Sequence, residues 1–248
     1  MPPAGPSPPS TPSSLPQLEQ FLLAIPVLLF SMVAHEYAHG YAALRQGDPT
    51  AYQLGRLTWN PVKHIDPFLT VLMPILTWWG SGGGFIFGGA KPVPVMPRNY
   101  RNYRRGDIIV SLAGIATNLL LFVACTVLIV LLGLIGRSVE PTTSTMALLQ
   151  SMMVRGVIFN LILAVFNLLP IPPLDGSHVM KYLLPPAWAL RYQQFGRYGI
   201  LVLLILFVTS LGRQVFDVWM RPVAILARAA FEFTFPYMLG SPFGLGIG

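Results

Sequence analysis

The segment H-E-Y-A-H places two imidazoles and a carboxylate within five residues, at His35, Glu36 and His39. If the segment is helical, positions four apart lie on one face, so His35 and His39 can direct ring nitrogens toward one metal ion. Glu36 lies beside that face, where its carboxylate can reach water instead of the metal. Two ligands and a general base on one helical turn are the basis of H-E-x-x-H zinc sites. The pattern predicts hydrolytic zinc chemistry.

A polar cluster that only satisfies its own hydrogen bonds is the alternative explanation for these residues. They follow an apolar run of the chain. An ionisable side chain inside a membrane span costs on the order of 3 kcal/mol on insertion scales, and such residues are usually functional. Three of them within five positions favour a metal site over packing.

A catalytic zinc site also needs a third protein ligand. Asp175 is the best candidate, because it ends an apolar stretch at a proline-rich turn that breaks the helix and aims the side chain inward. The alternative interpretation is that Asp175 is an ordinary turn residue. His178 is its rival as third ligand. Further candidates are His64, Asp66 and Asp107.

The composition indicates a polytopic α-helical membrane protein. Of the 248 residues, 54% are hydrophobic and only 10% are charged, and the mean hydropathy is +0.61, whereas a soluble domain carries about 25% charged residues. The net charge is +7, but the basic residues are spread over the connections without the clustered footprint of a nucleic-acid surface. We therefore expect a lipid bilayer and no nucleic acid as a partner.

Apolar stretches of spanning length alternate with polar connections. We expect an all-α bundle of about five to six transmembrane helices, with a re-entrant segment and a short β-hairpin near the cytosolic interface. Three regions are expected: a disordered Pro/Ser-rich tail at 1–17, a membrane domain at 18–220, and an amphipathic tail at 221–248 that lies in the interface or crosses weakly. The predicted elements are a helix from Leu18 to Arg45, a hairpin or ordered loop over 46–67, a short apolar segment at 68–79, and spans at 108–136, 156–174 and 198–212.

The basic residues also predict the orientation in the membrane. Eight of the sixteen lysines and arginines lie in segment 45–107, so the positive-inside rule places this segment in the cytosol and the amino-terminal tail outside. His35 and His39 then lie in the cytosolic half of the first helix. Asp175 reaches the same depth only if segment 68–79 does not cross completely, so we predict that this segment is re-entrant or shallow.

The stretch N-L-L-P-I-P-P-L-D-G, from Asn167 to Gly176, follows H-E-Y-A-H in a later apolar segment. Together the two motifs resemble those of the site-2 protease family of intramembrane zinc metalloproteases. The segments G-R-L-T-W-N-P-V-K-H-I-D-P and G-G-A-K-P-V-P-V-M-P are similar to connections in the compact prokaryotic branch of that family. The resemblance covers most of residues 20–185, and no PDZ-like or CBS-like module is visible in the sequence.

This resemblance implies one Zn²⁺ per chain, bound by His35, His39 and Asp175, with Glu36 activating water. It also implies that Asn118 and Asn167 hold the substrate backbone or the developing oxyanion. Asparagines in membrane bundles also make ordinary interhelical hydrogen bonds, so this second role stays open. The sequence before Asn118 reads A-G-I-A-T-N, where the family often has Gly-Pro.

The activity that the resemblance implies is hydrolysis of peptide bonds within or near transmembrane segments of membrane-protein substrates. The site would face the cytosolic side of a multi-pass cell-membrane protein. A zinc-binding transporter is one alternative, but the spans at 108–136 and 198–212 carry almost no polar residues. A non-catalytic scaffold is another, and the intact ligand set argues against it. A homo-oligomer is left open.

Overall fold

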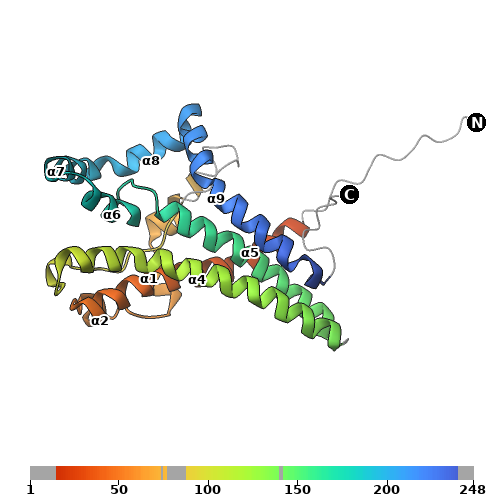
Figure 1. Ribbon diagram of the computed structural model, residues 1–248. Helices are drawn as coiled ribbons and strands as arrows, with labels where there is room; N and C mark the ends of the chain where they lie inside the picture. The colour runs from red at the N-terminus through yellow and green to blue at the C-terminus, as the bar shows by residue number, and fades with distance from the viewer. Residues whose placement is uncertain (1–14, 74, 77–87, 140–141, 240–248) are drawn as a thin grey trace, which may run out of the picture.

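The computed structural model describes residues 15–73, 75–76, 88–139 and 142–239, and in this part of the chain the regular structure is entirely helical (Figure 1). Three long helices form the centre: α1 (Leu15–Gln46), α4 (Tyr103–Ser138) and α5 (Thr143–Asn167). They pack pairwise against one another, and each contains a stretch long and apolar enough to cross a membrane. The predicted class, an all-α membrane bundle, is confirmed.

The central helices alternate in direction. Val110 and Asn118 of α4 contact His39 and His35 of α1, respectively, so the two helices are antiparallel. Between α4 and α5 the core includes Ile129, Val157 and Leu161, all of which are fully buried. The sequence prediction of a span at 108–136 agrees with α4, while α5 begins earlier than the charge-free stretch suggested.

A fourth long helix, α9 (Ser210–Thr234), lies along α5 (Figure 1). In the first half of α9 Trp219 donates to the Val165 carbonyl, and beyond the end of α9 the Tyr237 carbonyl accepts from Gln150, so α9 and α5 run in opposite directions. The apolar face predicted for the carboxyl-terminal tail therefore packs partly on α5, with Phe231 among the residues on the core.

The helix predicted at 198–212 is broken in the structure. Its first part forms α8 (Gly199–Val208), which ends at Val208, and the chain bends by 94° before α9 begins. Thr209 explains the break, because its hydroxyl accepts from Gly212 N and caps the new helix. A Cβ on Gly212 would lie 2.5 Å from the Leu206 carbonyl, so the absence of a side chain allows the fold-back.

The predicted β-hairpin is wrong, since no strand forms in the described residues. Instead, residues Thr50–Gln53 form the short helix α2 and Pro61–His64 form a 3₁₀ turn. Asn60 accepts from Val62 N and is followed by Pro61, a combination that starts helical turns. Alternating polarity in this segment therefore reflected capped turns and not a pleated strand.

The predicted re-entrant segment is described only in part. Residues Pro67–Leu72 form a π-helical turn capped by the side chain of Asp66, but residues 74 and 77–87 lie outside the described residues. Its path stays a prediction. Of the disordered tail predicted at 1–17, residues 1–14 lie outside the described residues, and α1 already begins at Leu15. In the described residues three helices are long and apolar enough to cross a membrane, or four if the bent pair ending in α9 is one span, so the five to six predicted spans are not confirmed.

Three shorter helices gather at one end of the bundle: α6 (Asp175–Leu183), α7 (Pro186–Phe195) and α8 (Figure 1). The stretch 168–174, which contains the three prolines of the N-L-L-P-I-P-P-L-D-G motif, leads from α5 into α6 without regular helix. This return places the start of α6 against α4, close to the histidines of α1.

Candidate metal centre

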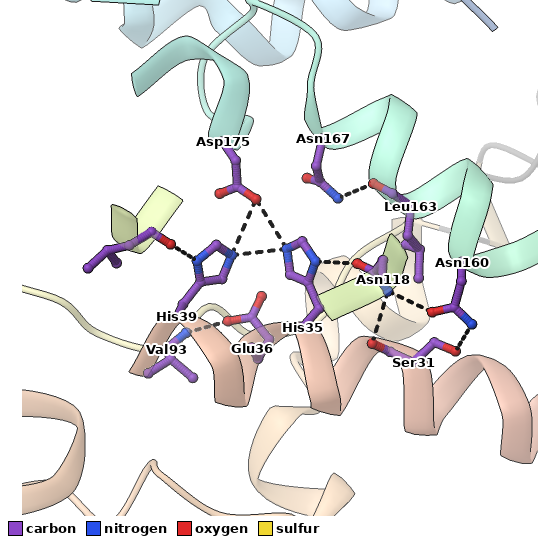
Figure 2. A network of polar contacts seen from close by, with 11 residues as sticks. Ser31, His35, Glu36, His39, Val93, Asn118, Asn160, Leu163, Asn167 and Asp175 are labelled. Carbon is purple, nitrogen blue, oxygen red and sulfur yellow. Dashed lines mark hydrogen bonds and ion pairs between the residues drawn. The ribbon is translucent and has the colours of Figure 1, made fainter. Parts of the chain in front are cut away.

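Two helices supply the side chains of the candidate centre (Figure 2). His35 and His39 lie one turn apart on α1, and Asp175 is the first residue of α6. The Oδ2 atom of Asp175 is 3.2 Å from the Nε2 atom of each histidine, and the two Nε2 atoms are 3.0 Å apart. The structure thus brings together the three residues that the sequence motifs singled out as ligands.

The residues present fit a zinc ion. Their ligand atoms lie within 4.8 Å of one another, and no other such group of His, Cys, Asp or Glu side chains is found in the described part of the chain. The Oδ2 atom of Asp175 is buried and has no hydrogen-bond donor. Three atoms with lone pairs that point into one small space are stabilised by a cation, and two imidazoles with one carboxylate form a donor set typical of catalytic zinc.

Helix α4 orients both imidazoles through their Nδ1 atoms, which lie on the side of each ring away from Asp175. The Nδ1 atom of His35 lies 2.5 Å from Oδ1 of Asn118, and Nδ1 of His39 lies 2.7 Å from the Val110 carbonyl. Both partners are acceptors, so Nδ1 carries the proton in each ring and Nε2 is left with a free lone pair. Partners of this kind fix the tautomer and the ring orientation of metal-binding histidines.

A buried polar network holds Asn118 in turn (Figure 2). Its amide group donates to Asn160 Oδ1 at 2.8 Å, and Asn160 donates to the Ser31 hydroxyl at 2.9 Å. All three side chains are at most 1% exposed. The contacts of Asn118 are therefore interhelical, one of the two roles that the sequence left open, and they lead directly to His35.

Gly114 makes room for the centre on the face of α4. A Cβ at this position would lie 2.5 Å from His35 Cε1 and 2.5 Å from His39 Nε2. Any side chain at this position would displace the imidazoles. In the sequence, Gly114 was only the residue before Ile115, where the family often has proline, and that departure did not indicate this role or those of Val110 and Asn160. The spacing of positions 110, 114 and 118 on one helix face was the available signal.

Asn167, the second asparagine implied by the resemblance, is the last residue of α5. Figure 2 shows its side chain beside Asp175. Its amide donates to the Leu163 carbonyl at 2.9 Å, a bond within its own helix. The structure places this residue at the edge of the centre but gives it no contact with the histidines.

Glu36 lies between the two histidines in sequence, and its carboxylate has a main-chain partner. The Oε2 atom accepts from Val93 N at 2.7 Å (Figure 2). Val93 has proline on both sides, so neither neighbouring residue can offer an N–H group. This contact fixes one oxygen of the proposed general base.

Val93 belongs to an extended segment, residues 91–96, which we call the strap. Lys91 N donates to the His64 carbonyl at 2.7 Å, and the Lys91 carbonyl accepts from Arg56 at 3.1 Å. At the other end Met96 N donates to Asp48 Oδ2 at 2.6 Å. The strap is therefore anchored on both sides of the point where it contacts Glu36.

The remaining ligand candidates lie elsewhere and have partners of their own. The ring of His64 bonds the Thr58 carbonyl at 2.9 Å. Asp66 caps the turn that begins at Pro67. Asp107 and His178 contact each other at 3.2 Å, away from the three-residue group. Of the five candidates for a third ligand, Asp175 is the one whose carboxylate lies within 4.8 Å of the ring nitrogens of both histidines.

The family profile described as peptidase family M50 matches residues 23–210 of this chain. The chain belongs to peptidase family M50. It is a site-2-protease-type zinc metalloprotease. The expected family, enzyme class and zinc dependence are thereby confirmed, and the alternatives of a transporter or a scaffold are not favoured.

Curated relatives of this M50 protease carry matching names. It is 40% identical over 188 residues to "Putative zinc metalloprotease YwhC" of Bacillus subtilis. The aligned region covers 76% of this chain and 81% of the relative. It is 34% identical over 202 residues to "Putative zinc metalloprotease Rip2" of Mycolicibacterium smegmatis, covering 79% and 71% of the two chains. No solved structure matches the chain.

Proposed function

We propose that this M50 protease hydrolyses peptide bonds within or near transmembrane segments of membrane proteins, with His35, His39 and Asp175 as its zinc ligands. The observation that carries the proposal is the convergence of Asp175 Oδ2 on both histidine Nε2 atoms, at 3.2 Å each. Residues of two separate helices supply these atoms, and the carboxylate oxygen among them has no other partner.

Glu36 is the proposed general base. When bound, Zn²⁺ supplies a Lewis acid that polarises the scissile carbonyl and lowers the pKa of water to about 7. Glu36 takes a proton from the attacking water and passes it to the departing amine nitrogen. Its position on the same helical turn as His35 and His39 supports this role, and the Val93 N–H group holds its Oε2 atom.

The two asparagines are proposed to act in different ways. Asn167 lies beside Asp175 at the end of α5, where its side chain is placed to hold the backbone of a substrate (Figure 2). Asn118 is engaged by His35 at one end and by Asn160 at the other. Its contribution to substrate binding or to the oxyanion therefore acts through the orientation of His35.

We place the active site toward the cytosolic side of a multi-pass cell-membrane protein. Helix α1 ends at Gln46, so His39 lies about 10 Å along the helix axis from that end. The same end of the bundle carries Arg101 just before α4, and Arg104 and Arg105 in the first turn of α4. A cluster of basic residues at one end of the spans favours the cytosol for that end.

The decisive experiment compares Glu36→Gln with Glu232→Gln in the full chain reconstituted with a model transmembrane substrate. Glu232 is an exposed glutamate that pairs only with Arg228 on α9, so it serves as the matched control. We expect Glu36→Gln to slow cleavage by about 10²- to 10⁴-fold while zinc content stays at the wild-type level. Glu232→Gln should cleave normally.

Three outcomes would contradict the proposal. Cleavage by Glu36→Gln at the wild-type rate would show that Glu36 is not the general base. Wild-type zinc content in His35→Ala and Asp175→Ala would show that these residues are not zinc ligands. Metal flux into vesicles that survives in Glu36→Gln, without any cleavage by the wild type, would favour a transporter.

A further inference from the structure

The proposed ligand Asp175 lies on a short element whose placement needs an explanation. It begins α6, which has nine residues, and the stretch 168–174 before it is irregular. A helix of this length is not stable by itself, so the position of Asp175 depends on what α6 packs against. Helix α6 packs mostly against α4.

One buried carboxylate of α4 forms the polar link between these helices. Asp107 is 2% exposed. Its Oδ1 atom contacts His178 Nδ1 at 3.2 Å, and its Oδ2 atom accepts from Lys181 Nζ at 2.5 Å and from the Tyr182 hydroxyl at 2.9 Å. Positions 178, 181 and 182 share one face of α6, so a single carboxylate holds the whole face.

A second contact strengthens the same link. The guanidinium of Arg104 lies 5.4 Å from the centre of the Tyr182 ring, and it donates to the Tyr182 carbonyl at 3.5 Å. Lys181 lies 5.7 Å from the ring centre of Tyr103. The first turns of α4 thus contact the last turn of α6 through both side chains and main chain.

Three residues of α4 contact the histidines, and Asp107, which contacts α6, lies on the same helical face. Asp107, Val110, Gly114 and Asn118 are spaced three or four apart, so they lie in a row along the helix. Val110 and Asn118 orient the histidines, and Gly114 makes room for them. Asp107 extends the row to α6, which carries the third ligand.

We infer that Asp107 is a positioning residue for the metal centre: its contacts with His178, Lys181 and Tyr182 set the distance between Asp175 and the histidines. Helix α4 supplies no ligand, yet it fixes the histidines through Val110 and Asn118 and the aspartate through Asp107. The inference rests on the proposed function, since it assumes that the three residues bind zinc.

The test measures zinc affinity and not only cleavage. The full chain would be purified without metal as wild type, Asp107→Asn, Tyr182→Phe and Gln150→Leu, and its zinc dissociation constant measured by competition with a chelator. Gln150 is the matched control, because it is a buried polar residue, 3% exposed, that anchors a different element: it donates to the Ile129 carbonyl and accepts from Leu239 N.

We expect Asp107→Asn to weaken zinc binding by about tenfold, the lower end of the range for residues behind metal ligands. Tyr182→Phe removes one of the contacts and should weaken binding less. In the zinc-free protein, amide hydrogen exchange of residues 175–183 should be faster in both variants. With Co²⁺ as the probe, the visible absorption bands should change in Asp107→Asn. Gln150→Leu should lower thermal stability and leave zinc affinity and the Co²⁺ spectrum unchanged.

The inference is overturned if Asp107→Asn binds zinc with the wild-type affinity, or if Gln150→Leu weakens binding as much as Asp107→Asn does. If Asp107→Asn does not fold, Tyr182→Phe decides, and wild-type zinc affinity in that variant overturns the inference. His35→Ala, measured alongside, distinguishes a failure of the positioning role of Asp107 from a failure of the proposed metal site. Loss of zinc in His35→Ala with unchanged Asp107→Asn refutes the positioning role alone, whereas unchanged zinc in His35→Ala refutes the metal site itself.

Discussion

The side-chain oxygen of Asn118 lies 2.5 Å from Nδ1 of His35, and its amide nitrogen lies 2.8 Å from the side-chain oxygen of Asn160. The second contact determines the first. Asn160 presents an acceptor because its own amide nitrogen donates to Ser31 and to the Gly156 carbonyl. Asn118 must therefore direct its NH₂ group to Asn160 and its oxygen to His35, which leaves Nε2 of His35 free for a metal.

Replacing Asn118 with leucine removes the acceptor while keeping the side-chain volume similar. We expect zinc affinity to fall by about 10- to 100-fold, because the His35 ring loses the partner that fixes its tautomer. Chelator competition on the purified protein measures this. Thr126→Val on the same helix is the control, since Thr126 bonds only the Phe122 carbonyl of its own helix. Unchanged affinity in Asn118→Leu would contradict the prediction.

Gly114→Ala tests whether the imidazoles of His35 and His39 need the space that the missing side chain of Gly114 leaves on α4. An alanine inside a helix is normally about 1 kcal/mol more favourable than glycine, so without a clash the variant should be more stable. The added Cβ would lie 2.5 Å from both His35 and His39, and we expect lower thermal stability and loss of bound zinc. Ala116→Ser on the exposed face of α4 is the control. A Gly114→Ala protein that melts higher and retains zinc would show that the histidines move aside.

Local patterns were enough to single out two of the proposed ligands and the proposed base, because His35, Glu36 and His39 lie on one turn and need no partner to be recognised. Asp175 was identified through its prolines and its motif. The sequence could not separate it from Asp107, His178 and His64 by residue type alone. Their partners lie on other elements, so only the packing of α6 on α4 distinguishes the proposed ligand Asp175 from residues such as Asp107 and His178, which link the two helices.

The fold was predictable where a single helix decides the structure, and less so where a cap or a close approach does. The charge-free stretch at 108–136 became α4. The apolar run at 198–212 is equally hydrophobic, yet the Thr209 cap and the contact of Gly212 with Leu206 divide it. Hydropathy does not detect either feature. The hairpin failed for the same reason, since Asn60 and Pro61 start a turn.

Val93→Pro tests the hydrogen bond between the strap and the carboxylate of Glu36. The substitution removes the N–H group that lies 2.7 Å from Oε2, and the prolines at 92 and 94 suggest that the backbone tolerates another. We expect the turnover number to fall by up to about 10²-fold, as for a displaced catalytic group, while zinc content and KM stay close to the wild type. Val93→Ala keeps the N–H group and should retain activity. Faster cleavage by Val93→Pro would mean that the strap inhibits the enzyme.

Asp48 anchors the strap, and its ionisation gives a prediction for acid stability. Burial by itself would raise the pKa of this carboxyl, but hydrogen bonds from Thr50, Asn99 and Met96 outweigh it and hold the pKa below its ordinary value. A carboxyl whose pKa is lower in the folded state stabilises the fold above its unfolded pKa of about 3.9, and this contribution is lost as the pH falls through the folded value.

Thermal unfolding of the wild type and of Asp48→Asn between pH 7 and pH 3 measures this contribution. We expect the wild type to melt higher by a constant margin from pH 7 to about pH 5, where Asp48 is ionised in both folded and unfolded chains. Below about pH 4 the margin should shrink, because the unfolded chain takes up a proton that the folded chain excludes. Asp217→Asn, on α9, is measured alongside as the control variant. A margin that widens in acid would contradict the assignment, since it would require Asp48 to be protonated in the fold.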